Sequence, residues 1–373
     1  MKSIAGDRIF FAFVAAIALA GLAIFSSATL GLLARESSLI SQEILLQAGL
    51  GLGLGFIALW AASAIPFALI KRAAPYLYVA TLILTALVFL PGIGWSSGGA
   101  TRWINLGFTT MQPSEFLKIG FVLAFAAWLA PRARQLKDPK KGLMPFLAYT
   151  GASAALLLAQ PNTSTTLLIL ATGAVIYFAA GAPWRDFGIL IGGAALLVGA
   201  LLLAGMVLHV DDYRLRRLET FVNPSANPLG SGYQIQQSLI AIGSGGVLGR
   251  GFGQSVQKFN YLPEPDGDSI FAVFAEETGF IGAAFLLALF IGLAARGIVI
   301  AGHARDLFGG LVALGLSFLI VFQAFINIGA MLGIIPLTGL PLPFVSHGGT
   351  ALVAVLLMCG LILNVARNEA HRA

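Results

Sequence analysis

Long apolar runs constrain this chain more than any other feature of its sequence. A membrane-spanning helix needs about 20 predominantly apolar residues, and runs of that length follow one another along most of the chain. They predict an all-α polytopic integral membrane protein that forms a single domain over residues 1–373. We expect ten transmembrane helices, at residues 9–33, 44–65, 75–92, 112–130, 143–160, 164–181, 187–209, 270–295, 307–333 and 350–366.

The composition excludes several other classes of protein. Only 10% of the residues are charged, whereas soluble domains carry about 25%. The net charge of +6 suits topology control and contact with anionic membrane lipids, and the chain has no basic-aromatic motif for binding nucleic acid. Its single cysteine, Cys359, can form neither an intrachain disulfide nor a CxxC metal site.

Lysine and arginine residues predict the orientation, because they concentrate in the inner loops of membrane proteins. With the N-terminus inside, they gather in the predicted inner segments, most clearly in PRARQLKDPKK at residues 131–141. The short outer segments and outer helix ends hold Arg35, Arg102 and Lys118. Both termini are therefore expected in the cytoplasm.

One predicted outer loop, at about residues 210–269, is unusually long for a connection without a function of its own. It contains YQIQQSLIAI at residues 233–242, which predicts an amphipathic helix, followed by the glycine-rich GSGGVLGRGFG. We expect an ordered loop that lies against the membrane. In the last outer segment, at residues 334–349, prolines and glycines exclude a continuous helix and indicate a segment that lines a cavity.

Acidic residues cluster where the long outer loop enters the eighth predicted span. Carboxylates at or below a membrane surface are costly and are typical of functional sites. Asp268 stands at this boundary, where it is either a general base or the N-cap of the helix that follows. Of the sixteen acidic residues, the stretch Tyr261–Gly282 holds Glu264, Asp266, Asp268, Glu276 and Glu277.

Glu276 and Glu277 are expected to lie within the eighth span. Successive helical residues point about 100° apart, so at least one of these carboxylates must face a polar cavity or a basic partner. An internal salt bridge without chemistry explains them as well as a functional role does.

A second polar group is expected near the outer face. Glu115 and Lys118 are spaced i, i+3 and share a helix face, so they form either a self-satisfying ion pair or, with Arg102, a site for a phosphate. Trp103 either contacts substrate or anchors the chain at the interface.

Five further polar residues are candidates for roles at the site. Gln160 and Asn162 belong to a tight polar hairpin, and Asn327 is expected to bond to another helix. Ser346 and His347 form a polar mouth beside two glycines. The sum of these features is an outward-facing polar cavity, which suits either an enzyme that acts on a lipid-linked anionic substrate or a transporter that moves an anion.

Six ordered motifs together resemble the SEDS family (shape, elongation, division and sporulation), which includes RodA and FtsW. The resemblance covers nearly the whole chain, and the QKFNYLPE stretch leans toward the FtsW type. The motifs are GGATRWINLG, MQPSEFLK, AQPN, NPLGSGYQIQQSLIAIGSGGVLGRGFGQSVQKFNYLPE, DSIFAVFAEETGFIG and FINIGAMLGIIPLTGLPLPFVSHGG.

The resemblance implies an inverting peptidoglycan glycosyltransferase that polymerises lipid II at the outer leaflet of the bacterial cytoplasmic membrane, for division or elongation. The family's catalytic acid precedes an F-A-V segment, which selects Asp268 over Asp266. A class B penicillin-binding protein is the expected partner. No cofactor is certain, no metal ligands are assigned, and a divalent cation such as Mg²⁺ is left open.

The resemblance also ranks the remaining candidates. Glu276, Glu277, Gln160, Asn162 and Asn327 are expected to support the site without touching substrate. The expected substrate contacts are Arg102, Lys118, Trp103, Glu115, Arg214, Arg216, Lys258, Ser346 and His347.

The chain departs from the family pattern at three positions. Asn162 replaces the acid of the usual Gln-Pro-Asp hairpin, Ser269 stands where Phe is commoner, and His347 stands where Tyr is commoner. We interpret Asn162 as structural. A lipid II flippase and a non-catalytic scaffold for a transpeptidase are the alternative functions.

Overall fold

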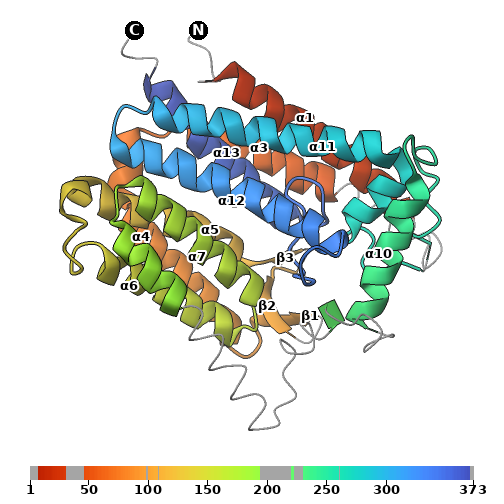
Figure 1. Cartoon of the computed structure of the whole chain (residues 1–373), viewed down its shortest axis with the longest axis horizontal. Helices are drawn as coiled ribbons and strands as arrows, with labels where there is room; N and C mark the ends of the chain where they lie inside the picture. The colour runs from red at the N-terminus through yellow and green to blue at the C-terminus, as the bar shows by residue number, and fades with distance from the viewer. Residues whose placement is uncertain are drawn as a thin grey trace.

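The chain folds into a helical bundle, which the computed structural model describes at residues 7–30, 46–97, 100–107, 109–193, 220–221, 230–259 and 261–369. Figure 1 shows most of the long helices running side by side. Their bounds are α1 Arg8–Thr29, α3 Leu54–Ala64, α4 Phe67–Ala86, α5 Pro113–Leu129, α6 Leu143–Ala159, α7 Thr163–Ala179, α10 Ser231–Gly245, α11 Ile270–Gly302, α12 Leu307–Met331 and α13 Gly349–Glu369. A π-helical segment, Leu46–Gly53, leads into α3, and 3₁₀ turns follow α4 (Leu87–Phe89) and α5 (Ala130–Gln135).

The prediction of a polytopic membrane protein is confirmed. Among the described residues, six helices are long and apolar enough to cross a membrane, namely α1, α4, α5, α11, α12 and α13. Three shorter apolar helices, at Gly51–Ala64, Leu143–Ala159 and Thr163–Ala179, accompany them. The count of ten spans stays a prediction, because most of the expected span at 187–209 and the first part of the expected outer loop lie outside the described residues.

Two predicted boundaries were wrong. Helix α4 begins at Phe67 rather than at residue 75, so that Lys71 and Arg72 lie within it and Pro75 sits inside the helix. Long basic side chains can extend from a helix end toward the interface, so charge alone did not mark the start of this helix. Helix α11 continues past residue 295 to Gly302.

A small antiparallel sheet corrects the expectation of a loop between α4 and α5. Strands β1 (Gly94–Ser97), β2 (Ala100–Asn105) and β3 (Thr110–Met111) pair in the order β1-β2-β3. Trp95 lies opposite Trp103 in the register of β1 and β2. Aromatic and β-branched residues favour such a pleated surface, and β2 carries Arg102 toward the start of α5.

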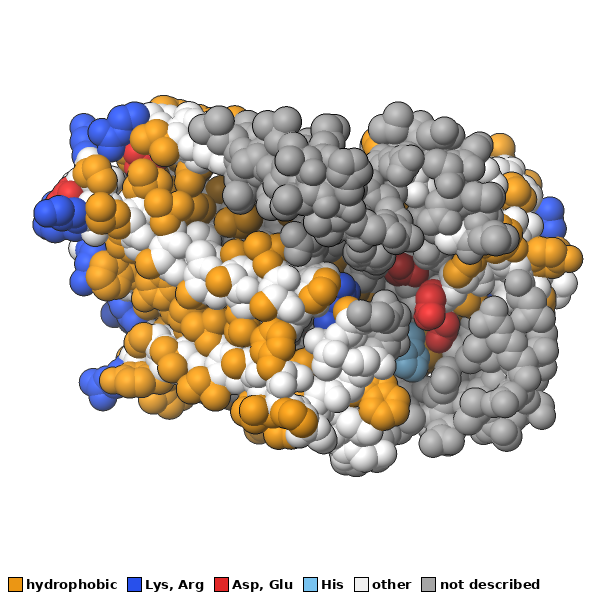
Figure 2. Space-filling model, turned by 90° about the horizontal axis from the view of Figure 1, so that it is seen from below, with side chains coloured by type: hydrophobic (Ala, Val, Ile, Leu, Met, Phe, Trp, Pro, Cys, Tyr) orange, Lys and Arg blue, Asp and Glu red, His pale blue; other side chains and the backbone are white. Residues whose placement is uncertain are grey.

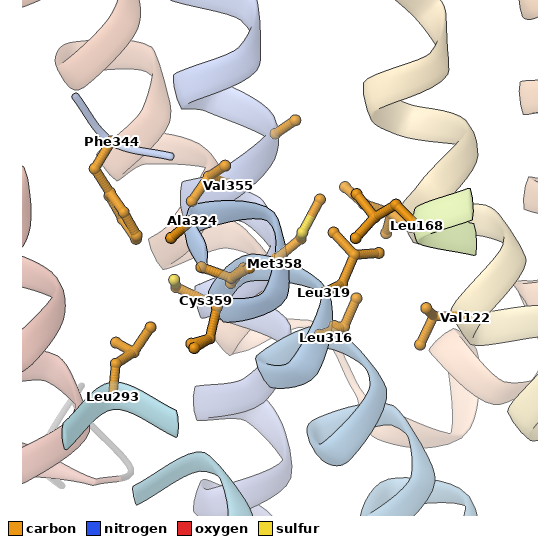
Figure 3. Packing of buried hydrophobic residues seen from close by; sticks show 14 of the residues in the cluster. Val122, Leu168, Leu293, Leu316, Leu319, Ala324, Phe344, Val355, Met358 and Cys359 are labelled. Atoms are coloured by element: carbon orange, nitrogen blue, oxygen red, sulfur yellow. The ribbon is translucent and has the colours of Figure 1, made fainter. Parts of the chain in front are cut away.

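Helix α12 lies at the centre of the apolar core. Figure 3 shows its residues Leu316 and Leu319 between side chains of α13 on one side and those of α5 and α7 on the other, and Ala324 beside Val355. Since lipid is as apolar as these side chains, close packing rather than removal from water holds such helices together. Gly360 of α13 illustrates this, because a Cβ there would overlap the carbonyl oxygen of Leu59 on α3.

Both chain ends lie at the same end of the bundle (Figure 1), and Lys and Arg side chains gather toward one end of the face in Figure 2. At the start of α1, Asp7 pairs with Arg296 of α11 at 2.6 Å. The Asp7 carboxylate also accepts a hydrogen bond from the N–H of Phe10 at 2.8 Å, which caps α1. This basic end matches the predicted inner face.

Asp7 supplies a test of this anchoring. Burial by itself raises the pKa of Asp7, but Arg296 and the N–H groups of Phe10 and Ile9 outweigh it and hold the pKa below 3.8. Because the folded pKa is lowered, the stabilisation by Asp7 is present above about pH 4 and is lost as the pH falls through the lowered pKa. We expect Asp7→Ala to lower the melting temperature in detergent more than Asp7→Asn, because Asn keeps the cap, worth about 1 kcal/mol. Equal melting temperatures for the two variants at pH 7 would contradict the cap.

Candidate functional site

A polar cavity of about 690 Å³ lies where the sheet meets the start of α11 and the segment before α13. Figure 2 shows acidic and histidine side chains gathered at a hollowed part of the molecule, away from the basic end. Most of the lining comes from non-helical segments. It includes Trp95, Arg102, Trp103, Gln112, Pro161, Glu264, Asp266, Asp268, Pro341 and His347.

Asp268 is half-buried on the cavity wall. The amide Nε2 of Gln234, on α10, donates to Asp268 Oδ1 at 3.0 Å and to Ser269 Oγ at 2.9 Å. The N-cap of α11 is Ser269, so the interpretation of Asp268 as the helix N-cap is wrong. The carboxylate is held from the side by α10 and remains part of the cavity.

The backbone around Asp268 is fixed to the segment before α13. Asn327 Nδ2 donates to the carbonyl oxygens of both Asp268 and Leu340 at 2.8 Å, and Ser346 Oγ donates to that of Gly267 at 2.6 Å. These three hydrogen bonds hold the backbone at Gly267 and Asp268 in place against the segment before α13. Asn327 therefore donates to two loop carbonyl oxygens rather than bonding to another helix. Ser346 holds the segment between Asp266 and Asp268 through its hydrogen bond to Gly267.

His347 and two further acids share the cavity with Asp268. The N–H of His347 donates to the carbonyl oxygen of Asp266 at 2.7 Å, and its Nδ1 lies 3.8 Å from Asp266 Oδ2. Glu264 lines the same wall with a positive φ of 47°. Within the described part of the chain, no three His, Cys, Asp or Glu side chains are grouped so that they could hold a metal ion.

Among the described side chains that line this cavity, Arg102 supplies a guanidinium group. The polar hairpin positions it, since its guanidinium donates to the carbonyl oxygens of Gln160 (3.1 Å) and Pro161. Gln160 is itself fixed by a 2.7 Å bond from its amide to the carbonyl oxygen of Thr85. Asn162 caps α7 through a 3.3 Å bond from the N–H of Thr165, which is a structural role for the residue that replaces the usual acid.

The structure does not bring Lys118 and Glu115 to the cavity. They form a 2.8 Å ion pair whose side chains are 0% and 2% exposed, and Lys118 Nζ also donates to Gln323 Oε1 at 2.8 Å. Gln323 Nε2 in turn donates to the carbonyl oxygen of Pro341 at 2.9 Å. The expectation that this pair contacts substrate does not fit its position, because the first turn of α5 points into the bundle.

Lys258 is likewise buried away from the cavity. Its Nζ lies 2.8 Å from Glu277 Oε1 and donates to the carbonyl oxygens of Ser27 and Gly253. Glu276 accepts hydrogen bonds from Ser255 Oγ (2.6 Å) and from the backbone N–H groups of residues 256 and 257. Both glutamates thus fasten the end of the outer loop to α11 and α1. Arg214 and Arg216 lie outside the described residues.

Gln234 and Gln323 are functional candidates that sequence reasoning missed. Gln234 lies in the predicted amphipathic helix, next to the buried Ile235 and one turn before the buried Ser238. A glutamine next to the buried face of an amphipathic helix indicates a polar side chain that needs a hydrogen-bond partner, but the sequence does not show which residue that partner is.

Comparison with known proteins shows which family this chain matches. A family model described as "Cell cycle protein" (FTSW_RODA_SPOVE) matches residues 7–371. The chain is 40% identical over 315 residues to Stage V sporulation protein E of Bacillus subtilis, which covers 84% of each chain. It is 39% identical over 317 residues to the probable peptidoglycan glycosyltransferase FtsW of Halothiobacillus neapolitanus, covering 84% of this chain and 75% of that one.

Solved structures show the same fold. A chain from a structure on coordination of polymerization and crosslinking by a peptidoglycan synthase complex matches with a TM-score of 0.77 and 31% identity, covering 97% of this chain and 98% of that chain. The crystal structure of the Rod shape determining protein RodA of Thermus thermophilus matches with a TM-score of 0.67 and 31% identity, covering 97% of each chain.

The buried pair on α5 gives a prediction that separates a structural role from contact with substrate. Lys118→Met leaves a buried carboxylate without its partner and is expected to cost about 3–5 kcal/mol, seen as a fall in melting temperature. The double variant Glu115→Gln/Lys118→Met is expected to recover most of that loss and to regain activity. A double variant that regains stability but stays inactive would instead place Lys118 in contact with substrate.

Proposed function

The chain belongs to the family of cell cycle proteins that includes FtsW, RodA and SpoVE, and on that premise we propose that it is a peptidoglycan glycosyltransferase that polymerises lipid II into glycan strands. The observation that carries the proposal is the half-buried Asp268 on the wall of a polar cavity. The 39% identical FtsW relative is named for this activity, and the cavity lies on the same fold as a chain of a peptidoglycan synthase complex.

In the proposed reaction Asp268 is the general base. Its carboxylate accepts the proton of the 4-hydroxyl of the acceptor sugar while that oxygen attacks the anomeric carbon of the donor. The bond from this carbon to the pyrophosphate oxygen breaks, undecaprenyl pyrophosphate leaves, and the configuration at the carbon inverts. A positioned base of this kind contributes about 10²–10⁴-fold to a rate.

Arg102 is the proposed partner of the leaving group. Preorganised cations lower the barrier when they face the charge that develops in the transition state. Arg102 fits this role because carbonyl oxygens of the hairpin fix its guanidinium at the cavity. Trp103 and His347 line the same cavity and are proposed to contact the sugars. Among the residues that the structure describes, no three His, Cys, Asp or Glu side chains are grouped as a metal site, and a divalent cation such as Mg²⁺ stays a prediction.

The proposed setting is the outer leaflet of the bacterial cytoplasmic membrane, in division or elongation. Lys and Arg gather at the end that holds the chain termini, while the cavity lies away from it. This arrangement suits a substrate whose sugars lie outside and whose lipid stays in the bilayer. The proposed partner is a class B penicillin-binding transpeptidase, because a matching structure concerns coordinated polymerization and crosslinking.

Asp268 variants test the proposal. Purified protein, together with its cognate transpeptidase, is expected to convert lipid II into glycan strands that a gel resolves. Asp268→Ala and Asp268→Asn are expected to lower the rate by about 10²–10⁴-fold because the proton acceptor is lost. Asp266→Asn, which changes the neighbouring acid, is expected to lose much less.

Two outcomes would overturn the assignment. Polymerisation by Asp268→Ala at the wild-type rate would remove Asp268 as the base. If the wild-type protein makes no polymer with its partner but moves lipid II between the leaflets of liposomes, the protein is a transporter.

Gln234 is proposed as a positioning residue for Asp268. An N–H donor stabilises the ionised carboxylate, and a hydrogen bond to a charged group is worth about 1.5–3 kcal/mol. Gln234→Ala is therefore expected to lower kcat and to move the acid limb of the pH–rate profile upward by about one unit. The other charged or titratable groups that line the cavity, Glu264, Asp266, His347 and Arg102, are unchanged in this variant.

The matched control is Gln236→Ala, on the exposed side of the same helix, which should leave the profile unchanged. A purely structural role for Gln234 predicts a lower melting temperature and lower activity at all pH values, with the acid limb in its original place.

A further inference from the structure

An exposed apolar turn follows α10. Residues 246–252, here called the glycine turn, carry three large side chains with high exposure: Val247 at 64%, Leu248 at 79% and Phe252 at 63%. A contiguous apolar surface of this kind in a loop marks contact with something other than water.

The glycine turn is bonded to a break in α11. Gly279 has non-helical backbone angles (φ 66°, ψ −164°), and the N–H groups of Phe280 and Ile281 donate to the carbonyl oxygens of Gly246 (2.9 Å) and Val247 (3.2 Å). In return, the N–H groups of Arg250 and Gly251 donate to the carbonyl oxygens of Glu276 and Glu277. A non-helical backbone is tolerated at membrane depth only where its polar groups are satisfied by protein or water, and these four bonds contribute to that condition.

The turn also continues the exposed face of α11. Beyond the break, this helix exposes Phe280 (71%), Ile281 (55%), Phe285 (63%), Ile291 (51%) and Ile298 (57%). The exposed apolar face of a spanning helix faces lipid. Since Gly246 and Val247 are bonded to residues 280 and 281, the glycine turn lies at one end of this lipid-facing surface.

The lengths of α11 and α1 give the depth of the glycine turn in the membrane. From Phe280 to Arg296, which pairs with Asp7 at the basic end, α11 rises about 24 Å at 1.5 Å per residue. From Asp7 to Ser27, α1 rises about 30 Å, and Ser27 Oγ donates to Glu277 at 2.6 Å. The hydrocarbon core is about 30 Å thick. Glu277 therefore lies near its outer boundary, and Phe280 with the glycine turn lies just inside.

We propose that the glycine turn is inserted in the outer leaflet, with Val247, Leu248 and Phe252 in contact with lipid acyl chains. Arg250 suits this placement, because its 41% exposed side chain reaches back to Glu276 at 3.3 Å and stays at the level of the boundary. The inserted turn ties the loop that follows α10, and with it the junction that carries Asp268, to a fixed height in the membrane. This inference depends on the membrane fold and not on the proposed reaction.

Fluorescence quenching in vesicles tests the insertion. In a Cys359→Ala background, Leu248→Cys and Phe252→Cys are labelled with a small environment-sensitive dye and reconstituted in vesicles of phosphatidylcholine and phosphatidylglycerol. A nitroxide on acyl carbon 5 is expected to quench both labels more strongly than aqueous iodide does. Phe285→Cys is the control for a lipid-facing site, and Lys140→Cys, an exposed charged position in the basic segment 131–141, is the control for a water-facing one.

The controls make each outcome decisive. Labels at residues 248 and 252 that behave like the label at 285 support insertion. Labels that behave like the label at 140 overturn it, and loss of iodide quenching only when a transpeptidase is added would assign the turn to a protein partner instead. Size-exclusion elution compared with the unmodified chain shows that the variants are folded, and none of these readings requires polymerisation.

Discussion

The hydrogen bonds of Asn327 are the interaction on which the candidate site depends. One amide, buried in α12, donates to the carbonyl oxygens of Asp268 and Leu340, and so joins two non-helical segments that both contribute residues to the cavity lining. Ser346, with its bond to Gly267, adds a second connection between them. Irregular backbone within a helical membrane protein persists only where its polar groups find partners, and the central helix α12 supplies one of them here.

The same need of polar groups for partners divides the charged side chains near the site into two groups. Glu115 with Lys118, and Glu277 with Lys258, are buried ion pairs that hold helices and loops together. Glu264, Asp266 and Asp268 instead line an open cavity. A carboxylate can exchange a proton with a substrate only where the substrate can reach it, so the second group is placed to take part in the proposed reaction and the first supports the structure around it.

The apolar surface extends this organisation to the bilayer. The glutamates that fasten the outer loop lie next to the break in α11, and the glycine turn, with its exposed apolar side chains, is hydrogen-bonded to both sides of that break. Charged groups at the boundary and apolar groups beneath it together specify a height in the membrane. The site is therefore positioned by α12 from inside the bundle and, in our proposal, by lipid from outside it.

The sequence by itself determined the membrane fold, the basic end of the bundle and the amphipathic helix that became α10, and the resemblance of its motifs to a family selected Asp268, whose role stays a prediction. Each of these follows from local composition or from motifs, because hydropathy, charge and turn chemistry are read along the chain. The tertiary structure alone decided that Gln234 and Asn327 hold the Asp268 junction, that Lys118 and Lys258 are buried pairs, and that residues 94–111 form a sheet. These depend on contacts between residues far apart in the chain, and the sequence shows that a polar side chain needs a partner without showing which partner it meets.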